Sequence, residues 1–548
     1  MNQRGTISPF VPLMLSLAMV AGLFIGRDMS GGGNVRDPLT ILRFREPSAS
    51  EKIGQVLDLI DRSYVDTVEK NRLVDEVLQD VLQRLDPHSY YISAAEIRAA
   101  QEPLEGSFEG IGVEFSLQRD TIVVISPVEG GPSAAAGIRA GDRILSADSV
   151  MLAGMNISNE DVMRNLRGPQ GSEVMLKILR TGRERPFDVK ITRGHIPIHS
   201  VAVSLLGEDG TGYIKVIRFA KNTHEEFMQA ARALKDQGMK KLVLDLRGNG
   251  GGYLTSAIEM ADEFLENGRV IVFTKGRHSP RRDVTATSNG ELHDIPLAVL
   301  IDEGSASASE IIAGAVQDND RGIIVGRRSF GKGLVQEHVP LPDESAVRLT
   351  TARYYTPSGR SIQRPYGEGI DYLQDFDSRY EHGEMVSIDS IRLDTTQRFT
   401  TLKGRTVYGG GGIMPDIFVG ADTTEASEYL SEIFFSGTLN QFAFDVADRE
   451  RSRLMNGYGT SSEFARRWSV SNELMNDLQA FAEKAGIRDR PEQRERSHDQ
   501  LSQRLKANIA RNIWGNTGYY EIMLSSDDIY GRAREALNNA DPTTMSSK

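Results

Sequence analysis

Apolar residues follow different spacings in successive parts of the chain, and each change of spacing marks a predicted boundary. Between residues 51 and 105 they recur at every third or fourth position, which predicts helices with a break near Asp66 and Thr67. Between 106 and 193, short alternating runs separated by turn residues predict a small β-barrel. Between 194 and 423, longer apolar strands alternate with helical segments at glycine-rich junctions, which is typical of an α/β domain.

The two ends of the chain have patterns of their own. From 424 to 548, apolar stripes on charged helices predict a helical accessory region. Residues 28–50 contain repeated glycine and proline and predict a linker. Residues 10–26 are uncharged and mostly apolar, so we expect 1–27 to form a signal or transmembrane anchor segment. An uncleaved anchor is favoured over a cleaved signal peptide.

Composition narrows the classes of function. The chain has 548 residues, 39% hydrophobic and 26% charged, as expected of a globular protein with several domains. Its formal net charge of −12 argues against a nucleic-acid partner, because phosphate binding requires a basic surface. Cysteine is absent, which excludes disulfide bonds and thiol catalysis and removes most zinc sites.

The candidate catalytic residues lie between residues 297 and 340. An apolar strand ends shortly before three alternating serines, Ser305, Ser307 and Ser309, and a helical pattern follows them. A second strand leads to a lysine, Lys332, with a glycine on each side. Serines at a strand-to-helix junction, with a lysine on a neighbouring loop, predict a nucleophile and its general base.

Two other readings of this stretch are weaker. Residues 326–333 nearly match a phosphate-binding loop, but Gly333 replaces the required hydroxyl and a predicted strand follows instead of a helix. A serine–histidine–aspartate triad is the other reading, but none of the nine histidines, which include His338 and His293, lies in a recognisable triad motif. The Gly-x-Ser-x-Gly elbow is also missing, because Ser309 replaces its last glycine.

A serine–lysine dyad accounts for more of the stretch. Lysine acts as a base only when neutral, which requires burial to lower its pKa from about 10.4. Residues an even number apart on a strand share a face, so Lys332 and Gln336 are expected to point the same way. Gln336 could then orient the lysine by a hydrogen bond.

The barrel-like region has a recognisable motif. Residues 136–145 look like the signature of a PDZ domain, and Gly110, Ile111, Gly112 and Val113 resemble the carboxylate-binding loop of that family. In such a loop, glycines let backbone N–H groups converge on the terminal carboxylate of a peptide, whose backbone pairs with the adjacent strand edge.

Three segments carry a wider resemblance. They are Leu85-Asp-Pro-His-Ser-Tyr-Tyr91, Asp245-Leu-Arg-Gly-Asn-Gly-Gly-Gly252, and Ser305-Ala-Ser-Ala-Ser-Glu310 followed by Gly331-Lys-Gly-Leu-Val-Gln336. Together they resemble the carboxyl-terminal processing proteases, or tail-specific proteases, of the S41 peptidase family. The resemblance implies a multidomain α+β protein with an S41-type α/β protease core in 194–423, an inserted PDZ β-barrel domain in 106–193, an N-terminal membrane-anchor helix, a helical N-terminal arm and a helical C-terminal region.

The resemblance also assigns roles to residues. Ser307 is the expected nucleophile, Lys332 the general base and Gln336 its orienting partner. The backbone donors expected to bind the oxyanion are the N–H of Ala308 and one N–H of the glycine run, either that of Gly251 or that of Gly252.

The expected function is a serine endopeptidase that cleaves proteins near their C-termini after the PDZ domain binds an apolar tail. It needs no metal, nucleotide or other cofactor. We expect it in the bacterial cell envelope, anchored in the inner membrane with its bulk in the periplasm, or exported if the signal is cleaved. An envelope adaptor protein and a second copy of the chain are further candidate partners. The alternative function is a non-catalytic PDZ tail-binding scaffold or chaperone.

Overall fold

The computed structural model describes residues 48–539 except 129, 368 and 373, together with residues 14 and 19. Nearly all of the predicted anchor and of the predicted linker therefore lie outside the described residues. No described helix is both long and apolar enough to cross a membrane.

The chain divides into two compact units, residues 1–76 and 77–548. The first contains α2 (Ala49–Ser63) and the start of α3 (Lys70–Gln83), which confirms the predicted break near Asp66 and Thr67. Ser48 and Glu51 form a capping box at the start of α2, in which each side chain accepts a backbone N–H of the other.

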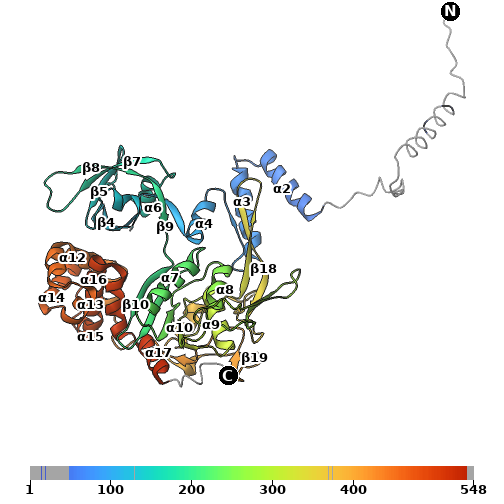
Figure 1. Cartoon of the computed structure of the whole chain (residues 1–548). Coiled ribbons are helices and arrows are strands. Elements are labelled where there is room, and N and C mark those ends of the chain that lie inside the picture. The colour runs from blue at the N-terminus through green and yellow to red at the C-terminus, as the bar shows by residue number, and fades with distance from the viewer. Residues whose placement is uncertain are drawn as a thin grey trace, which may run out of the picture. The chain divides into compact units, whose positions relative to one another are not determined.

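The PDZ-like part of the second unit is a six-stranded antiparallel sheet with two helices (Figure 1). Its elements are β3 (Val113–Gln118), β4 (Thr121–Pro127), α5 (Pro132–Ala135), β5 (Arg143–Ala147), β6 (Val150–Met151), α6 (Asn159–Leu166), β7 (Glu173–Leu179) and β8 (Phe187–Thr192). A separate ribbon of β2 (Ser107–Gly110) and β9 (Gly194–Pro197) carries the chain in and out. Ile111 and Gly112 form a loop between β2 and β3.

A six-stranded mixed sheet is the centre of the protease-like part. Its strands, in spatial order, are β10 (Val201–Leu206), β11 (Thr211–Val216), β12 (Lys241–Asp245), β15 (Leu297–Ile301), β16 (Ile323–Gly326) and β21 (Ile417–Phe418). All neighbours are parallel except β10 and β11. The helices α7 (Thr223–Asp236), α8 (Leu254–Asp262) and α9 (Ala308–Asp318) share a core with one face of this sheet. Period-two alternation therefore sends Leu244 toward these helices and Val243 toward the other face.

A second sheet is entirely antiparallel. It contains β1 (Tyr90–Ile92), β13 (Val270–Lys275), β14 (Arg282–Thr285), β17 (Leu334–Pro340) and β18 (Ala346–Tyr355), with β18 between β17 on one edge and β1 and β13 on the other. The short helix α4 (Ile97–Glu105) follows β1. The strand β18 therefore pairs both with β1, which contains the end of the 85–91 motif, and with β17, which follows the lysine loop.

The C-terminal region is helical, as predicted. It contains α11 (Glu428–Phe435), α12 (Thr438–Gly457), α13 (Ser461–Arg467), α14 (Asn472–Lys484), α15 (Pro491–Arg496), α16 (His498–Met523), the 3₁₀ turn Leu524–Ser526 and α17 (Asp528–Asn539). Most of these helices share a core of their own. The last helix, α17, instead places Ile529, Tyr530 and Ala533 against the second face of the six-stranded sheet. The protease-like core is thus completed by the end of the chain.

The segment from 366 to 397 contains α10 (Asp375–Glu381) and the 3₁₀ turn Ile388–Ser390. Arg379 and Glu384 are buried and paired at 2.8 Å, which ties the segment to the core through Arg328, a second partner of Glu384. Beyond it, β19 (Arg398–Thr400) and β20 (Thr406–Tyr408) form a small hairpin.

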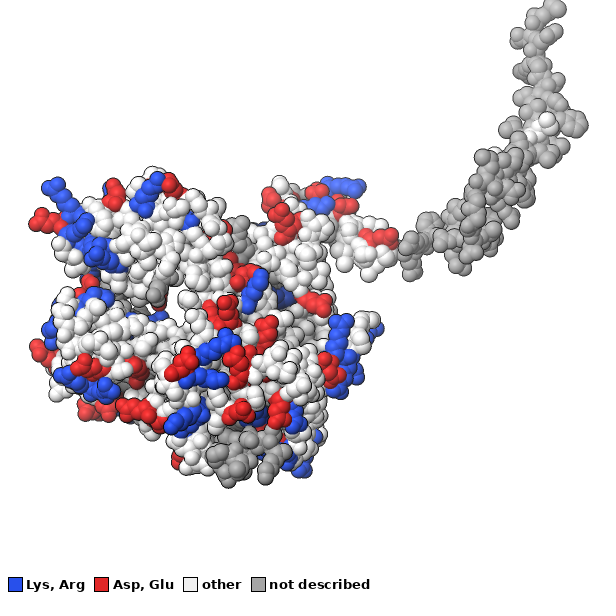
Figure 2. Space-filling model, viewed as in Figure 1, with Lys and Arg blue, Asp and Glu red and all other residues white. Residues whose placement is uncertain are grey.

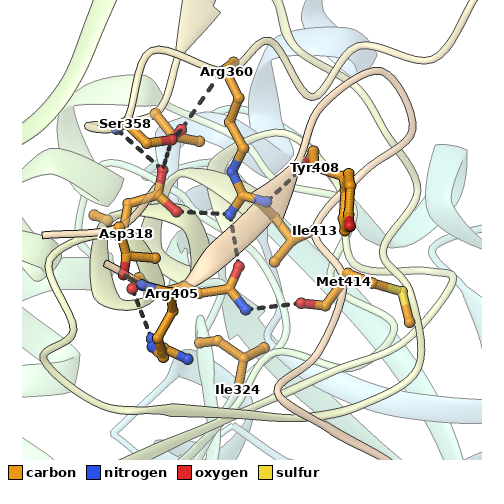
Figure 3. Close-up of polar contacts among 12 residues, drawn as sticks. Asp318, Ile324, Ser358, Arg360, Arg405, Tyr408, Ile413 and Met414 are labelled. Carbon is orange, nitrogen blue, oxygen red and sulfur yellow. Dashed lines mark hydrogen bonds and ion pairs between the residues drawn. The ribbon is translucent and has the colours of Figure 1, made fainter. Parts of the chain in front are cut away.

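A buried polar cluster holds the far end of α9 (Figure 3). The Arg360 guanidinium donates to Asp318 at 2.8 Å, to the Gln317 side chain at 2.6 Å and to the Tyr408 carbonyl at 3.0 Å. The side chains of Arg360 and Asp318 are both fully buried. Ser358 donates its hydroxyl to the same Asp318 carboxylate at 2.6 Å.

Replacing Arg360 by Met should destabilise the protein by about 3–5 kcal/mol, because it leaves a buried carboxylate without its cation. Urea unfolding would measure the loss. Arg405→Met is the matched control: this arginine pairs with Asp320 and Asp416 in the same cluster but is 42% exposed, so about 1 kcal/mol is expected. Equal losses in the two variants would contradict this account.

Candidate active site

The predicted nucleophile lies where β15 turns into α9. Ser307 precedes the first helical residue and has φ +54° and ψ −112°, a conformation that residues with a side chain rarely adopt. Such strain persists only where surrounding contacts enforce it, and it is characteristic of a sharp turn that presents a nucleophile.

The two neighbouring serines are occupied by structural hydrogen bonds. Ser305 is fully buried and donates its hydroxyl to the carbonyl of Leu246 at 2.9 Å. Ser309 is also fully buried and donates to the carbonyl of Asn249 at 2.8 Å. Both carbonyls belong to the loop after β12, so these serines fasten that loop to the start of α9. Ser307 is the serine of the three that lines a cavity.

The loop after β12 is held by a buried acid. Asp245 accepts hydrogen bonds from Tyr213 at 2.7 Å and Lys215 at 3.0 Å, and it forms an ion pair with Arg247 at 2.6 Å. Burial alone would raise the pKa of Asp245, but the cations of Arg247 and Lys215 outweigh it and hold the pKa below its usual range. The carboxylate therefore stays charged and fixes the start of the glycine run.

Close backbone approach explains two glycines of that run. A Cβ on Gly251, where φ is +101°, would lie 2.8 Å from Ser307 Cβ and 3.0 Å from the Ala308 nitrogen. A Cβ on Gly252 would lie 2.0 Å from the carbonyl oxygen of Phe219. The Gly251 N–H is already donated to the Asn249 side chain at 2.9 Å. Only glycine allows this loop to lie directly against the serine.

Lys332 lies on the loop between β16 and β17. Burial lowers the pKa of its ammonium group, and the nearby cation of Arg348 lowers it further, whereas Glu310 and Asp86 oppose the shift. The net direction is downward, which is the direction that a general base requires.

Glu310 joins the serine and lysine segments. Its fully buried carboxylate accepts backbone N–H groups from Ser307 at 2.9 Å and Lys332 at 2.8 Å, both on Oε2. The other oxygen accepts the Gly331 N–H at 2.8 Å and the Ser329 hydroxyl at 2.5 Å. Burial raises the pKa of Glu310, and these four donors counter the rise.

A second bridge lies beside the first. The Tyr354 hydroxyl is 2.6 Å from the Lys332 carbonyl oxygen and 3.1 Å from that of Ser307. The hydroxyl comes from β18, a strand of the antiparallel sheet, so it ties both sheets to the site. The main chains of Ser307 and Lys332 are thus held on both their N–H and C=O sides.

These segments enclose a cavity of about 500 Å³. Its lining includes Ser307, Ala308, Lys332, Gln336, Arg348, Tyr354 and Gly250, Gly251 and Gly252. Apolar walls come from Leu104, Leu254, Ile311, Leu334 and Val335. Within the described residues, no group of three or more His, Asp and Glu side chains is placed to hold a metal ion.

The strand argument for Gln336 does not hold. Lys332 precedes β17, and a register shift between Val335 and Gln336 interrupts the alternation of faces. Gln336 donates its amide to the carbonyl of His88, from the 85–91 motif. In the described part of the chain no hydrogen bond joins Gln336 to Lys332, although both residues line the cavity.

The predicted carboxylate loop lies at one edge of the PDZ-like sheet. Gly112 has φ +74°, and the loop accepts hydrogen bonds on the carbonyls of Ile111 and Gly112. Val113 begins β3, the end strand of its sheet. Gly110 lies in β2 and pairs with Gly194. The predicted residues are therefore contiguous, with a strand edge beside them.

Sequence reasoning missed Glu310, Tyr354 and Arg348 as parts of the site. For Glu310 a signal was present, because serine followed three residues later by glutamate at a helix start is the capping-box pattern. For Tyr354 and Arg348 there was none, since both come from β18 and meet the site only through sheet pairing.

Comparison with known proteins decides the family. Residues 210–372 match peptidase family S41, residues 110–191 match the PDZ domain, and residues 429–515 match a family of unknown function (DUF8443). The chain is 39% identical over 319 residues to a carboxy-terminal-processing protease of Bartonella bacilliformis, covering 57% of this chain and 72% of that protein. The chain belongs to the carboxy-terminal processing proteases of peptidase family S41.

A second curated relative agrees with this assignment. The carboxy-terminal processing protease CtpB of Bacillus subtilis is 32% identical over 365 residues, covering 63% of this chain and 75% of that protein. Among solved structures, a photosystem II D1 C-terminal processing protease is 26% identical, with a TM-score of 0.35 over 68% of this chain and 92% of that chain. As a member of family S41, the protein is a serine-type peptidase with a PDZ domain.

Replacing Glu310 by Gln should lower both stability and peptidase activity. The glutamine amide can place an NH₂ group where a carboxylate oxygen now accepts backbone N–H groups, so donors are left without an acceptor. This should lower the free energy of unfolding by about 1–3 kcal/mol. Urea unfolding and cleavage rates would measure the two losses. Glu337→Gln, at an exposed position on β17, is the control and should change neither. Unaltered activity in Glu310→Gln would show that this bridge does not position the site.

Proposed function

We propose that the protein is an endopeptidase that cleaves proteins near their C-termini with a dyad of Ser307 and Lys332. The supporting observation is the pair of bridges from Glu310 and Tyr354, which hold both residues on one cavity. Ser305 and Ser309 are engaged in backbone hydrogen bonds, which leaves Ser307 as the candidate nucleophile.

In the proposed reaction, neutral Lys332 removes the proton from the Ser307 hydroxyl as its oxygen attacks the scissile carbonyl carbon. Lysine then gives that proton to the leaving amine as the peptide C–N bond breaks, and an acyl-enzyme remains. A water molecule attacks the ester in the same way, which releases the acid and restores the serine.

The developing oxyanion would be bound by backbone donors. The Ala308 N–H lies at the start of α9, where helical N–H groups have no acceptor within the helix. Of the two glycine candidates, Gly252 is favoured, because the Gly251 N–H is donated to Asn249. Such donors stabilise the charge that forms in the transition state.

The PDZ domain would bind the apolar C-terminal tail of the substrate. The loop 110–113 and the adjacent end strand β3 support this assignment, since a peptide can extend an exposed sheet edge. Anchoring in the cell envelope stays a prediction of the sequence.

Ser307→Ala or Lys332→Ala should reduce cleavage of a protein with an apolar C-terminus by on the order of 10⁴-fold or more. Product masses, measured with the full chain, would show the loss. Ser309→Ala is the matched control, because it removes a buried structural hydrogen bond. It should lower the free energy of unfolding by about 1 kcal/mol, and it should still cut the substrate at the same position. Normal proteolysis by Ser307→Ala would reject the dyad, and binding of tails without any cleavage by the native chain would favour a scaffold.

The pH dependence of kcat/KM should reveal the lysine. Only neutral Lys332 can accept a proton, so the rate should rise as pH rises through its lowered pKa. Arg348→Gln removes a cation that lowers this pKa, so the rising limb should move to higher pH. Arg348→Lys keeps the charge and should leave the limb in place. A limb that does not move in Arg348→Gln would contradict the assignment of Lys332 as the base.

A further inference from the structure

A second groove, of about 340 Å³, lies beside the catalytic cavity. It is formed by the end of β13, the turn that follows it, one stretch of β18 and the start of β17. Its lining residues are Lys275, Gly276, Arg277, Leu334, Thr350, Thr351, Ala352, Arg353, Tyr355 and Tyr366.

Strand register explains how its charged and apolar residues come together. Arg353 on β18 is paired with Lys275 of β13 on one side and with Leu334 of β17 on the other. Directly paired residues of antiparallel strands project to the same side of a sheet. The three strands therefore present a row from Lys275 across Arg353 to Leu334.

All charged residues that line the groove are cations. Lys275, Arg277 and Arg353 are exposed, and no salt bridge joins any of them to a carboxylate of the described part of the chain. Arg353 instead lies over the ring of Tyr366, 5.8 Å from its centroid. In the lower centre of the face shown in Figure 2, Lys and Arg side chains lie next to Asp and Glu side chains.

The groove brings three cations together without a carboxylate among its lining residues. The chain carries 76 Asp and Glu against 64 Lys and Arg, so acidic partners are in excess. Like charges placed together repel each other, and a cleft with one sign of charge attracts a ligand of the opposite sign. The groove is thus suited to a carboxylate.

The groove and the catalytic cavity share Leu334. A peptide extended across the catalytic cavity could continue over this side chain into the groove. Tyr355, an aromatic residue of the groove lining, is held in place by its cross-strand neighbour Phe273, since the two rings stack with centroids 4.9 Å apart. An acidic residue near the scissile bond would then meet the cations.

We infer that this groove is a substrate subsite that binds a carboxylate of the polypeptide a few residues from the scissile bond. The inference rests on the proposed function and deepens it: apolar recognition selects the tail, and the groove adds selectivity for an acidic residue within the segment being cut. The carboxylate could belong to an Asp or Glu side chain or to the chain terminus, and the experiment separates these sources.

The test uses the full chain and alanine-rich peptides that share one apolar C-terminal tail. A single Glu is moved position by position, and each peptide has a twin with Gln in its place. Every peptide is also made with a C-terminal amide. At one or two positions, Glu should raise kcat/KM about fivefold over Gln at low ionic strength. The preference should fade at about 0.5 M salt, because exposed charges are then screened.

Arg277→Gln and Arg353→Gln should reduce the Glu-to-Gln ratio toward one. Arg281→Gln is the matched control: it lies on the same hairpin, but its guanidinium is paired with Asp283 at 2.6 Å. It should preserve the native ratio. Cleavage of peptides with a free C-terminal acid is also compared with cleavage of their amides. If a preference for the free acid disappears in Arg277→Gln and Arg353→Gln, the carboxylate bound by the groove is that of the chain terminus. If both variants retain the preference, the terminal carboxylate binds at the PDZ loop.

The inference would be overturned if the ratio of kcat/KM for Glu over Gln peptides is near one at every position and if replacing Arg277 or Arg353 does not change the effect of the C-terminal amide. A Glu preference that both groove variants retain would also overturn it. If no peptide is cleaved, the proposed function fails separately. Fluorescence anisotropy of the same labelled peptides on the Ser307→Ala chain would then decide whether the groove binds a carboxylate.

Discussion

The buried carboxylate of Glu310 is the contact on which the site depends. A carboxylate without water is stable only when donors surround it, and its four donors come from the serine turn and the lysine loop. These segments are about twenty residues apart in sequence, in different elements. The Glu310 carboxylate therefore keeps all four hydrogen bonds only when both segments are in their observed positions. The interactions that stabilise the fold here are the same ones that position Ser307 and Lys332.

Tyr354 makes the arrangement depend on the second sheet as well. Its hydroxyl lies close to the carbonyl oxygens of Ser307 and Lys332, the two residues that donate their backbone N–H groups to Glu310 Oε2. β18 also carries Arg348, which depresses the pKa of Lys332, and Arg353, which lines the cationic groove. One strand thus supplies a positional, an electrostatic and a binding element to the cleft.

The parallel sheet supplies the rigid side of the site. Asp245 fixes the end of β12, and the glycine run after it lies so close to Ser307 that no Cβ fits on Gly251. On the opposite face, the sheet is covered by Tyr530 and its neighbours from the last helix. Residues nearly three hundred positions beyond the glycine run therefore complete the core that supports it.

Local patterns along the chain were enough to predict most helices and strands and to identify the residues able to carry the chemistry. Apolar spacing placed β12, β15, α9 and β17 to within a few residues, since burial imposes periods of 2 and 3.6 on the chain. Motif resemblance singled out Ser307 and Lys332 from many serines and lysines. It could not show that Ser305 and Ser309 are already bonded to backbone carbonyls.

The contacts of each side chain, in contrast, depend on how distant segments pack together. The β17 bulge turned Gln336 to the His88 carbonyl, which a strict alternation of faces could not foresee. Glu310 was visible as a helix cap, but its bonds to Gly331 and Lys332 required the packing of a distant loop. The row of Lys275, Arg353 and Leu334 exists only through strand register. The spacing of apolar residues predicts which side of one segment is buried. It does not predict which segments pair with each other, and the site is formed by such pairing.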